Sequence, residues 1–125
     1  MNVLVVDDSS TMRRIVRNYL RGIGYTEVAE AENGASAFEQ LSKQPAGLVI
    51  TDWNMPVMDG LELVSRIRSA ANLKHVPVLM VTTVAEKEQI VRAIQAGITN
   101  YMVKPFDGET LRQKIDQVLL ATKGS

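Results

Sequence analysis

The sequence contains no cysteine and only one histidine, His75, so several kinds of chemistry are missing. Without cysteine there can be no disulfide, thiolate metal site or cysteine nucleophile. With a single histidine, a histidine-based metal or catalytic site is not expected. No apolar run approaches the roughly 20 residues that cross a bilayer. The first strand-like run begins at Val3, which leaves no room for a signal peptide. We therefore expect a soluble, cytoplasmic protein.

Charge of one sign is also lacking, because 14 Lys and Arg balance 14 Asp and Glu. Phosphate backbones are bound by basic faces, so nucleic acid is not expected as the main partner. The 125 residues suffice for one domain with one sizeable core. No linker or repeat interrupts them. We expect a single domain over residues 1–125, monomeric, with no separate DNA-binding module.

Short apolar runs alternate with helical patterns along the whole chain. Val3–Val6, Leu48–Thr51 and Val78–Val81 are nearly continuous apolar runs, which is typical of parallel strands covered on both faces. The strand-like segments 26–32 and 99–104 are more polar and therefore suit the edges of a sheet.

The segments between these strands follow the spacing of amphipathic helices. Parallel neighbours need such crossovers, so the pattern predicts an α/β doubly wound sheet. Placing the two polar strands at the edges gives the flavodoxin-like order 2-1-3-4-5. The expected helices are a first one capped at its start by Ser9, Ser10 or Thr11 and ended by Gly22 or Gly24, three over roughly 34–43, 60–71 and 86–96, and a last one around 111–119.

Polar side chains stand where the strands end. Asp7 and Asp8 follow the first strand, Asp52 ends the third, Thr82 the fourth, and Lys104 the fifth. The carboxyl ends of parallel strands meet at one edge, where such sheets bind ligands. Alone, Asp8 would suit a helix cap, but three converging carboxylates repel one another unless a cation intervenes.

Oxygen-only ligands favour a hard ion such as Mg²⁺, which commonly shares its site with a phosphate. Lys104 and the Thr82 hydroxyl could both meet phosphate oxygens at this edge. A carboxylate, a metal, a cation and a hydroxyl together suit an aspartyl phosphate. We therefore interpret Asp52 as a phosphoryl acceptor.

Four motifs carry a family resemblance across almost the whole chain. They are "VVDDSSTMRRIVRNYL", "TDWNMPVMDGLEL", "PVLMVTT" and "AGITNYMVKPF". In this order they resemble the receiver domain of bacterial response regulators, most closely the single-domain chemotaxis regulators. The resemblance implies a two-component signalling switch that takes its phosphoryl group from a sensor histidine kinase. It also implies a downstream protein target, with the flagellar motor switch as a candidate, and no enzymatic turnover beyond autocatalysis.

Residue roles follow from the resemblance by position. Asp52 would be phosphorylated; Asp8 and Asp52 would bind Mg²⁺ directly, with the backbone carbonyl of Asn54; and Asp7 would help through water. Lys104 would pair with phosphoryl oxygens. The switch residues would be Thr82, which bonds the phosphoryl group, and Tyr101, which turns inward in the active state. Family members usually have a cis peptide after this lysine, here before Pro105.

Simpler interpretations stand beside these roles. Tyr101 could be an ordinary half-buried edge aromatic, and Trp53 is expected to pack beside the site. The arginines of the first helix are expected to form a solvated face, which a kinase or another partner could use. Asp59 and Gly60 are expected to make a turn and begin the third helix.

The sequence departs from the chemotaxis pattern at Thr83, where alanine is common, and at Val84, where the enteric proteins carry glutamate. Both border the path of a hydrolytic water, so we hypothesise a different autodephosphorylation rate. A relay intermediate or a phosphate sink outside chemotaxis therefore stays an alternative function.

Two other classes of protein remain as alternatives. A Mg²⁺-dependent aspartyl-phosphate phosphatase would need a second carboxylic acid and a cap. A flavin module would need a phosphate-cradling loop where Asp7 and Asp8 stand.

Overall fold

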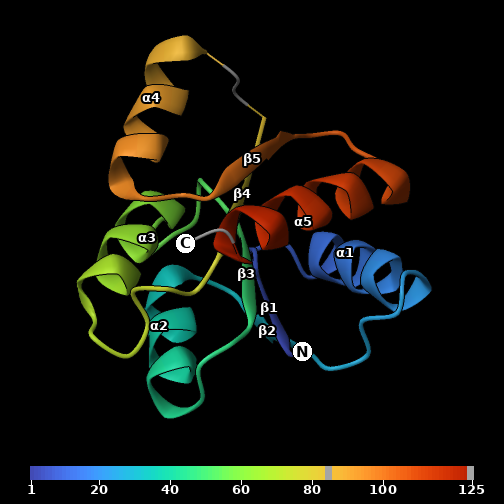
Figure 1. Cartoon of the computed structure of the whole chain (residues 1–125), viewed down its shortest axis with the longest axis horizontal. Coiled ribbons are helices and arrows are strands. Elements are labelled where there is room, and N and C mark those ends of the chain that lie inside the picture. The colour runs from blue at the N-terminus through green and yellow to red at the C-terminus, as the bar shows by residue number, and fades with distance from the viewer. Residues whose placement is uncertain (84–85, 124–125) are drawn as a thin grey trace.

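The computed structural model describes residues 1–83 and 86–123, in which strands and helices alternate (Figure 1). Five parallel strands form one sheet in the order β2-β1-β3-β4-β5, which confirms the predicted class and strand order. The strands are β1 (Val3–Val6), β2 (Val28–Ala31), β3 (Leu48–Asp52), β4 (Val78–Thr82) and β5 (Asn100–Val103). The helices are α1 (Ser10–Gly22), α2 (Gly34–Lys43), α3 (Gly60–Ser69), α4 (Lys87–Ala96) and α5 (Gly108–Lys123).

The sheet is covered on both faces, which is why its central strands are apolar throughout. Helices α1 and α5 lie on one face and α2, α3 and α4 on the other (Figure 1). Side chains alternate between these faces along β1: Val3 and Val5 join the core under α1 and α5, whereas Leu4 and Val6 join the other core. Burying one such side chain stabilises the fold by about 1.5–3 kcal/mol.

Both polar strands lie at the edges, as predicted, but several predicted boundaries were wrong. The strands are shorter than segments 26–32 and 99–104, because only 28–31 and 100–103 pair with a neighbouring strand. Helix α3 ends at Ser69 and not at residue 71, since Ala70 already has an extended backbone. Helix α4 begins at Lys87, with Glu86 as its extended N-cap residue.

Polar side chains fix where the helices begin. The Ser9 hydroxyl accepts a hydrogen bond from the Met12 amide at 3.1 Å and caps α1. The Asp59 carboxylate accepts one from the Glu62 amide at 2.9 Å and caps α3, which begins at Gly60 as predicted. Such caps contribute about 1 kcal/mol each. Because Ser9 caps α1, the Asp8 carboxylate is not used as a helix cap.

None of the described helices is long and apolar enough to cross a membrane.

Candidate functional site

The site lies at the carboxyl edge of the sheet, where the order of winding reverses between β1 and β3. Val6 is in register with Thr51, and Asp52 with Val81. One edge of the sheet therefore holds Asp7 and Asp8 after β1, Asp52 at the end of β3, and Lys104 after β5. The structure brings together there Asp7, Asp8, Asp52 and Lys104, all four of which the sequence predicted.

A lysine joins two of the three carboxylates. The Lys104 Nζ lies 3.3 Å from Asp7 Oδ2 and 3.3 Å from Asp52 Oδ2. These side chains are 17 %, 7 % and 13 % exposed, so the ion pairs are largely shielded from water. Asp8 is exposed, and one carboxylate oxygen from each aspartate lies within 4.8 Å of the others. Of the three carboxylates, only that of Asp8 is exposed, so Asp8 lies on the solvent side of Asp7 and Asp52.

Backbone amides orient the two buried carboxylates. Asp52 Oδ1 accepts a hydrogen bond from the Trp53 amide at 2.8 Å. Asp7 Oδ1 accepts one from the Ser9 amide at 2.9 Å. In each group one oxygen is held by the main chain, and the other faces the Lys104 ammonium. Both carboxylate oxygens of Asp52 are therefore held in direction by neighbouring groups.

The electrostatics of the site favour a cation. Burial raises the pKa of Asp52, the Lys104 ammonium opposes that rise, and the Asp7 carboxylate adds to it. One lysine cannot neutralise three carboxylates, and like charges at this separation repel. All the converging donors are oxygen, which is the ligand set that a hard divalent ion takes. The residues present therefore fit a metal of the Mg²⁺ type.

The loop that follows Asp52 is held close to it. Trp53 is 6 % exposed and packs in the core under α2 and α3, as expected for a residue beside the site. The Gly60 amide donates to the Trp53 carbonyl at 2.8 Å. A Cβ at Gly60 would stand 2.2 Å from the Asp52 carbonyl oxygen, so only glycine permits this approach. Val57, at the tip, has a φ of 70° and is 82 % exposed.

Two predicted switch residues lie on the neighbouring strands. Thr82, at the end of β4, is buried, and its carbonyl accepts a hydrogen bond from the Lys104 amide at 2.8 Å. Tyr101 is half-buried against the core under α3 and α4, and Lys114 Nζ lies 5.4 Å from its ring centroid. The peptide bond between Lys104 and Pro105 is cis, as the resemblance implied.

The two departures from the chemotaxis pattern lie beyond the end of β4. Thr83 is exposed, and so is Asn54 in the loop after β3. Val84 falls outside the described residues. The hypothesis about the hydrolytic water therefore stays a prediction.

One residue of the site was missed, because the arginines of α1 were interpreted as a solvated face. That interpretation holds for Arg14 and Arg21, which are exposed, but it was wrong for Arg13. The Arg13 side chain is 17 % exposed, donates to the Asp7 carbonyl at 2.6 Å and pairs with Glu30 at 2.9 Å. Nothing in the helical spacing distinguishes Arg13 from its neighbours, because its partners are distant in sequence from its helix: Glu30 lies on β2, and Asp7 follows β1.

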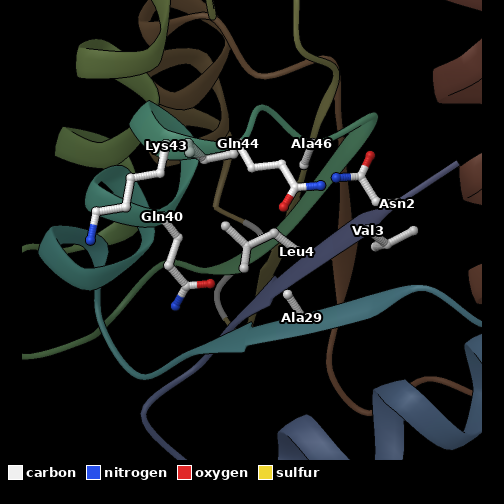
Figure 2. Close-up of a pocket in the computed structure, with 9 residues that line it drawn as sticks. Asn2, Val3, Leu4, Ala29, Gln40, Lys43, Gln44 and Ala46 are labelled. Carbon is white, nitrogen blue, oxygen red and sulfur yellow. The ribbon is translucent and has the colours of Figure 1, made fainter.

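A cavity of about 240 Å³ lies away from the carboxylates, between α2 and the strands β1 and β2. Figure 2 shows the side chains of Asn2, Gln40 and Gln44 around Leu4 and Ala29. Of the described residues that line it, only Lys43 is charged. Without converging titratable groups, this cavity offers none of the chemistry found at the carboxyl edge.

Comparison with known proteins gives the family to which this chain belongs. A family model described as "Response regulator receiver domain" matches residues 3–116. The chain belongs to the response regulator receiver domain family, and it is thus a switch component of two-component signalling.

The most similar relatives include chemotaxis proteins. The chain is 50 % identical over 118 residues to chemotaxis protein CheY-3 of Vibrio cholerae, covering 94 % of this chain and 91 % of that one. It is 46 % identical over 124 residues to chemotaxis protein CheY of Pseudomonas aeruginosa, covering 99 % and 100 %. Among solved structures, Vibrio cholerae CheY4 has a TM-score of 0.88 at 38 % identity, covering 94 % and 97 %.

Proposed function

We propose that this protein is a phosphorylation-dependent switch that accepts a phosphoryl group on Asp52 and signals through protein contacts, in chemotaxis. The observation that carries the proposal is the set of three carboxylates at the carboxyl edge with Lys104 between two of them. The kinship with chemotaxis proteins supports the biological context. The proposal includes a cytoplasmic, monomeric protein that has no turnover beyond its own phosphorylation and dephosphorylation.

Asp8, Asp52 and the carbonyl of Asn54 would hold Mg²⁺, with Asp7 acting through water. When bound, the ion supplies charge stabilisation to the transferred oxygens and lessens the repulsion between donor phosphate and carboxylates. Asp7 and Asp52 are kept in place by the Ser9 and Trp53 amides, so little reorganisation is required when the ligand arrives.

The transfer step is an in-line displacement at phosphorus. An Asp52 carboxylate oxygen attacks the phosphohistidine of a sensor kinase, and a new O–P bond forms as the N–P bond breaks. The imidazole nitrogen keeps the electron pair of the broken bond and takes up a proton from water. Lys104 then leaves its ion pair with Asp52 and pairs with a phosphoryl oxygen. The residues contribute positioning and electrostatics.

The new negative charge would bias a two-state element on β4 and β5. The Thr82 hydroxyl would turn toward the phosphoryl oxygens, and Tyr101 would move inward beside it. The output surface is then α4, β5 and α5, where Val91, Ile94 and Val103 are exposed. Exposed apolar side chains of this kind suit a protein partner, for which we propose a flagellar motor component.

Trp53 adjoins Asp52 and is the only tryptophan, so its fluorescence tests the proposal. Mg²⁺ should change the emission, and a small phosphodonor such as acetyl phosphate should change it further in wild type but not in Asp52→Asn. No response to Mg²⁺ would contradict the proposal. Recovery within seconds after donor removal favours a motor-type regulator, and a persistent signal favours a relay or phosphate sink. Sustained hydrolysis of external phosphate esters would instead indicate a phosphatase.

A further inference from the structure

Arg13 touches the Asp7–Asp8 turn through the main chain and not through a carboxylate. Its guanidinium donates from one terminal nitrogen to the Asp7 carbonyl at 2.6 Å, and from Nε to Glu30 Oε1 at 2.9 Å. The side chain is 17 % exposed, so water competes little for these donors. A planar guanidinium serves two acceptors in fixed directions, which a lysine cannot do.

The carbonyl of Asp7 belongs to the peptide that joins the two metal-site aspartates. Holding this oxygen fixes the plane of the Asp7–Asp8 peptide and therefore the direction in which Asp8 leaves β1. The Ser9 amide, which follows, donates to Asp7 Oδ1 at 2.9 Å. Asp8 has no such backbone bond among the described contacts and is exposed, so its direction depends on this peptide. A tilted peptide would spread the two carboxylates apart.

Glu30 holds the arginine in turn. It lies on β2, and its two carboxylate oxygens bind different arginines of α1: Arg13 at 2.9 Å and Arg17 at 3.0 Å. Its own carbonyl accepts a hydrogen bond from Gln40 of α2 at 3.0 Å. Arg17 shares the carboxylate but is 45 % exposed, and its contact is with Glu30 and not with the Asp7 carbonyl.

From this geometry we propose that Arg13 is a positioning residue of the metal and phosphoryl site, anchored by Glu30, that aligns Asp7 and Asp8 through the Asp7 carbonyl. The inference rests on the proposed function, because it assigns a residue to the site that would take Mg²⁺. A purely structural tie between α1 and β2 is the competing explanation. Such a tie would affect unfolding but leave the metal affinity alone.

Whether loss of Arg13 strengthens or weakens Mg²⁺ binding distinguishes a positioning role from a simple effect of its charge. Removing a positive charge near three carboxylates should by itself strengthen binding of Mg²⁺. Loss of alignment should weaken it, and substitutions behind metal ligands typically lower affinity by roughly 10- to 100-fold. Weaker binding on loss of Arg13 therefore cannot come from the charge change. Arg17→Gln removes the same charge and a Glu30 contact, so it is the matched control.

The test is a Mg²⁺ titration of Trp53 fluorescence in wild type, Arg13→Gln and Arg17→Gln, with thermal unfolding of each. We expect Arg13→Gln to weaken Mg²⁺ binding roughly tenfold or more, and Arg17→Gln to change it less than about threefold. Equal affinity in Arg13→Gln and Arg17→Gln, or tighter binding in both, would overturn the inference. If Arg13→Gln does not fold, Arg13→Lys replaces it, since it keeps the charge and should still bind Mg²⁺ more weakly than wild type.

A second readout needs no metal. The amide of Ser9 should exchange its hydrogen faster in metal-free Arg13→Gln than in metal-free Arg17→Gln, because its acceptor Asp7 is no longer aligned. Equal exchange rates would overturn the inference. If the wild type gives no Mg²⁺ response but the two variants still differ in Ser9 exchange, the proposed function is refuted. The role of Arg13 in positioning Asp7 is then still supported.

Discussion

Replacing Gly60 by alanine should push apart the two ends of the loop that follows Asp52. Gly60 is the first residue of α3, is buried, and donates its amide to the Trp53 carbonyl at 2.8 Å. An added Cβ would lie 2.2 Å from the Asp52 carbonyl oxygen and 3.1 Å from the Trp53 Cα. Ordinary contact begins at 3.4 Å. All of the crowded atoms are main chain, so no side-chain rotation can relieve them.

The magnitude follows from the two interactions that suffer. Overpacking of this kind typically lowers the free energy of unfolding by about 1–3 kcal/mol. Stretching the hydrogen bond between Gly60 and Trp53 removes about 1 kcal/mol more. We expect a total loss of about 2–4 kcal/mol, which a domain of ordinary stability survives. Because the Asp52 backbone must shift by roughly 1 Å, we also expect the affinity for Mg²⁺ to fall.

The assay is urea unfolding followed by circular dichroism, paired with Mg²⁺ titration of the folded variant. Gly108→Ala is a matched control, because Gly108 is also the first residue of a helix and also follows an aspartate. Its added Cβ would lie 3.2 Å from a ring carbon of Tyr19, a side chain that can yield. We expect a change within about 1 kcal/mol there. Equal stability and equal Mg²⁺ affinity in the two variants would mean that the close approach of Gly60 to the Asp52 carbonyl has no energetic consequence.

Three further predictions follow from single residues. Val57→Asn should raise the free energy of unfolding by about 1 kcal/mol, because a β-branched residue at a φ of 70° is strained and this one is 82 % exposed; a lower urea midpoint would contradict this. In Lys104→Met, Mg²⁺ should raise the melting temperature more than it does in wild type. The Lys104 ammonium lies 3.3 Å from Asp7 and from Asp52, so in wild type it competes with Mg²⁺ for these carboxylates. A smaller rise would contradict this prediction. Arg68→Ala should cost about 2–3 kcal/mol of stability, because Arg68 donates to three backbone carbonyls beyond α3. Its Mg²⁺ affinity should stay unchanged, and a loss of affinity without a loss of stability would be the wrong outcome.

Much of the fold could be predicted because strands buried on both faces of a parallel sheet are apolar at nearly every position. Val3–Val6 and Val78–Val81 are apolar throughout since helices cover both sides. The strand order followed from the polarity of the two edge strands. The convergence of the carboxylates could be predicted as well, because parallel strands present their carboxyl ends at one edge of the sheet.

Other features depend on contacts that no local pattern records. Arg13 and Arg14 occupy the same polar side of α1, and only the approach of Glu30 from β2 distinguishes them. The left-handed backbone at Val57 runs against the preference of valine and lies in a tight turn, in which the Met58 amide donates to the Pro56 carbonyl at 2.7 Å. Helix α3 stops at Ser69, where the Ala70 backbone turns extended, although the helical pattern continues to residue 71.

Whether Asp52 accepts the phosphoryl group can be measured by intact-protein mass spectrometry. The protein is incubated with acetyl phosphate and Mg²⁺, then compared with the same mixture containing a chelator and with Asp52→Asn. We expect a mass gain of one phosphoryl group in wild type, lost with the chelator and absent in the variant. A gain that persists in Asp52→Asn, or that maps to Asp7 or Asp8, would contradict it.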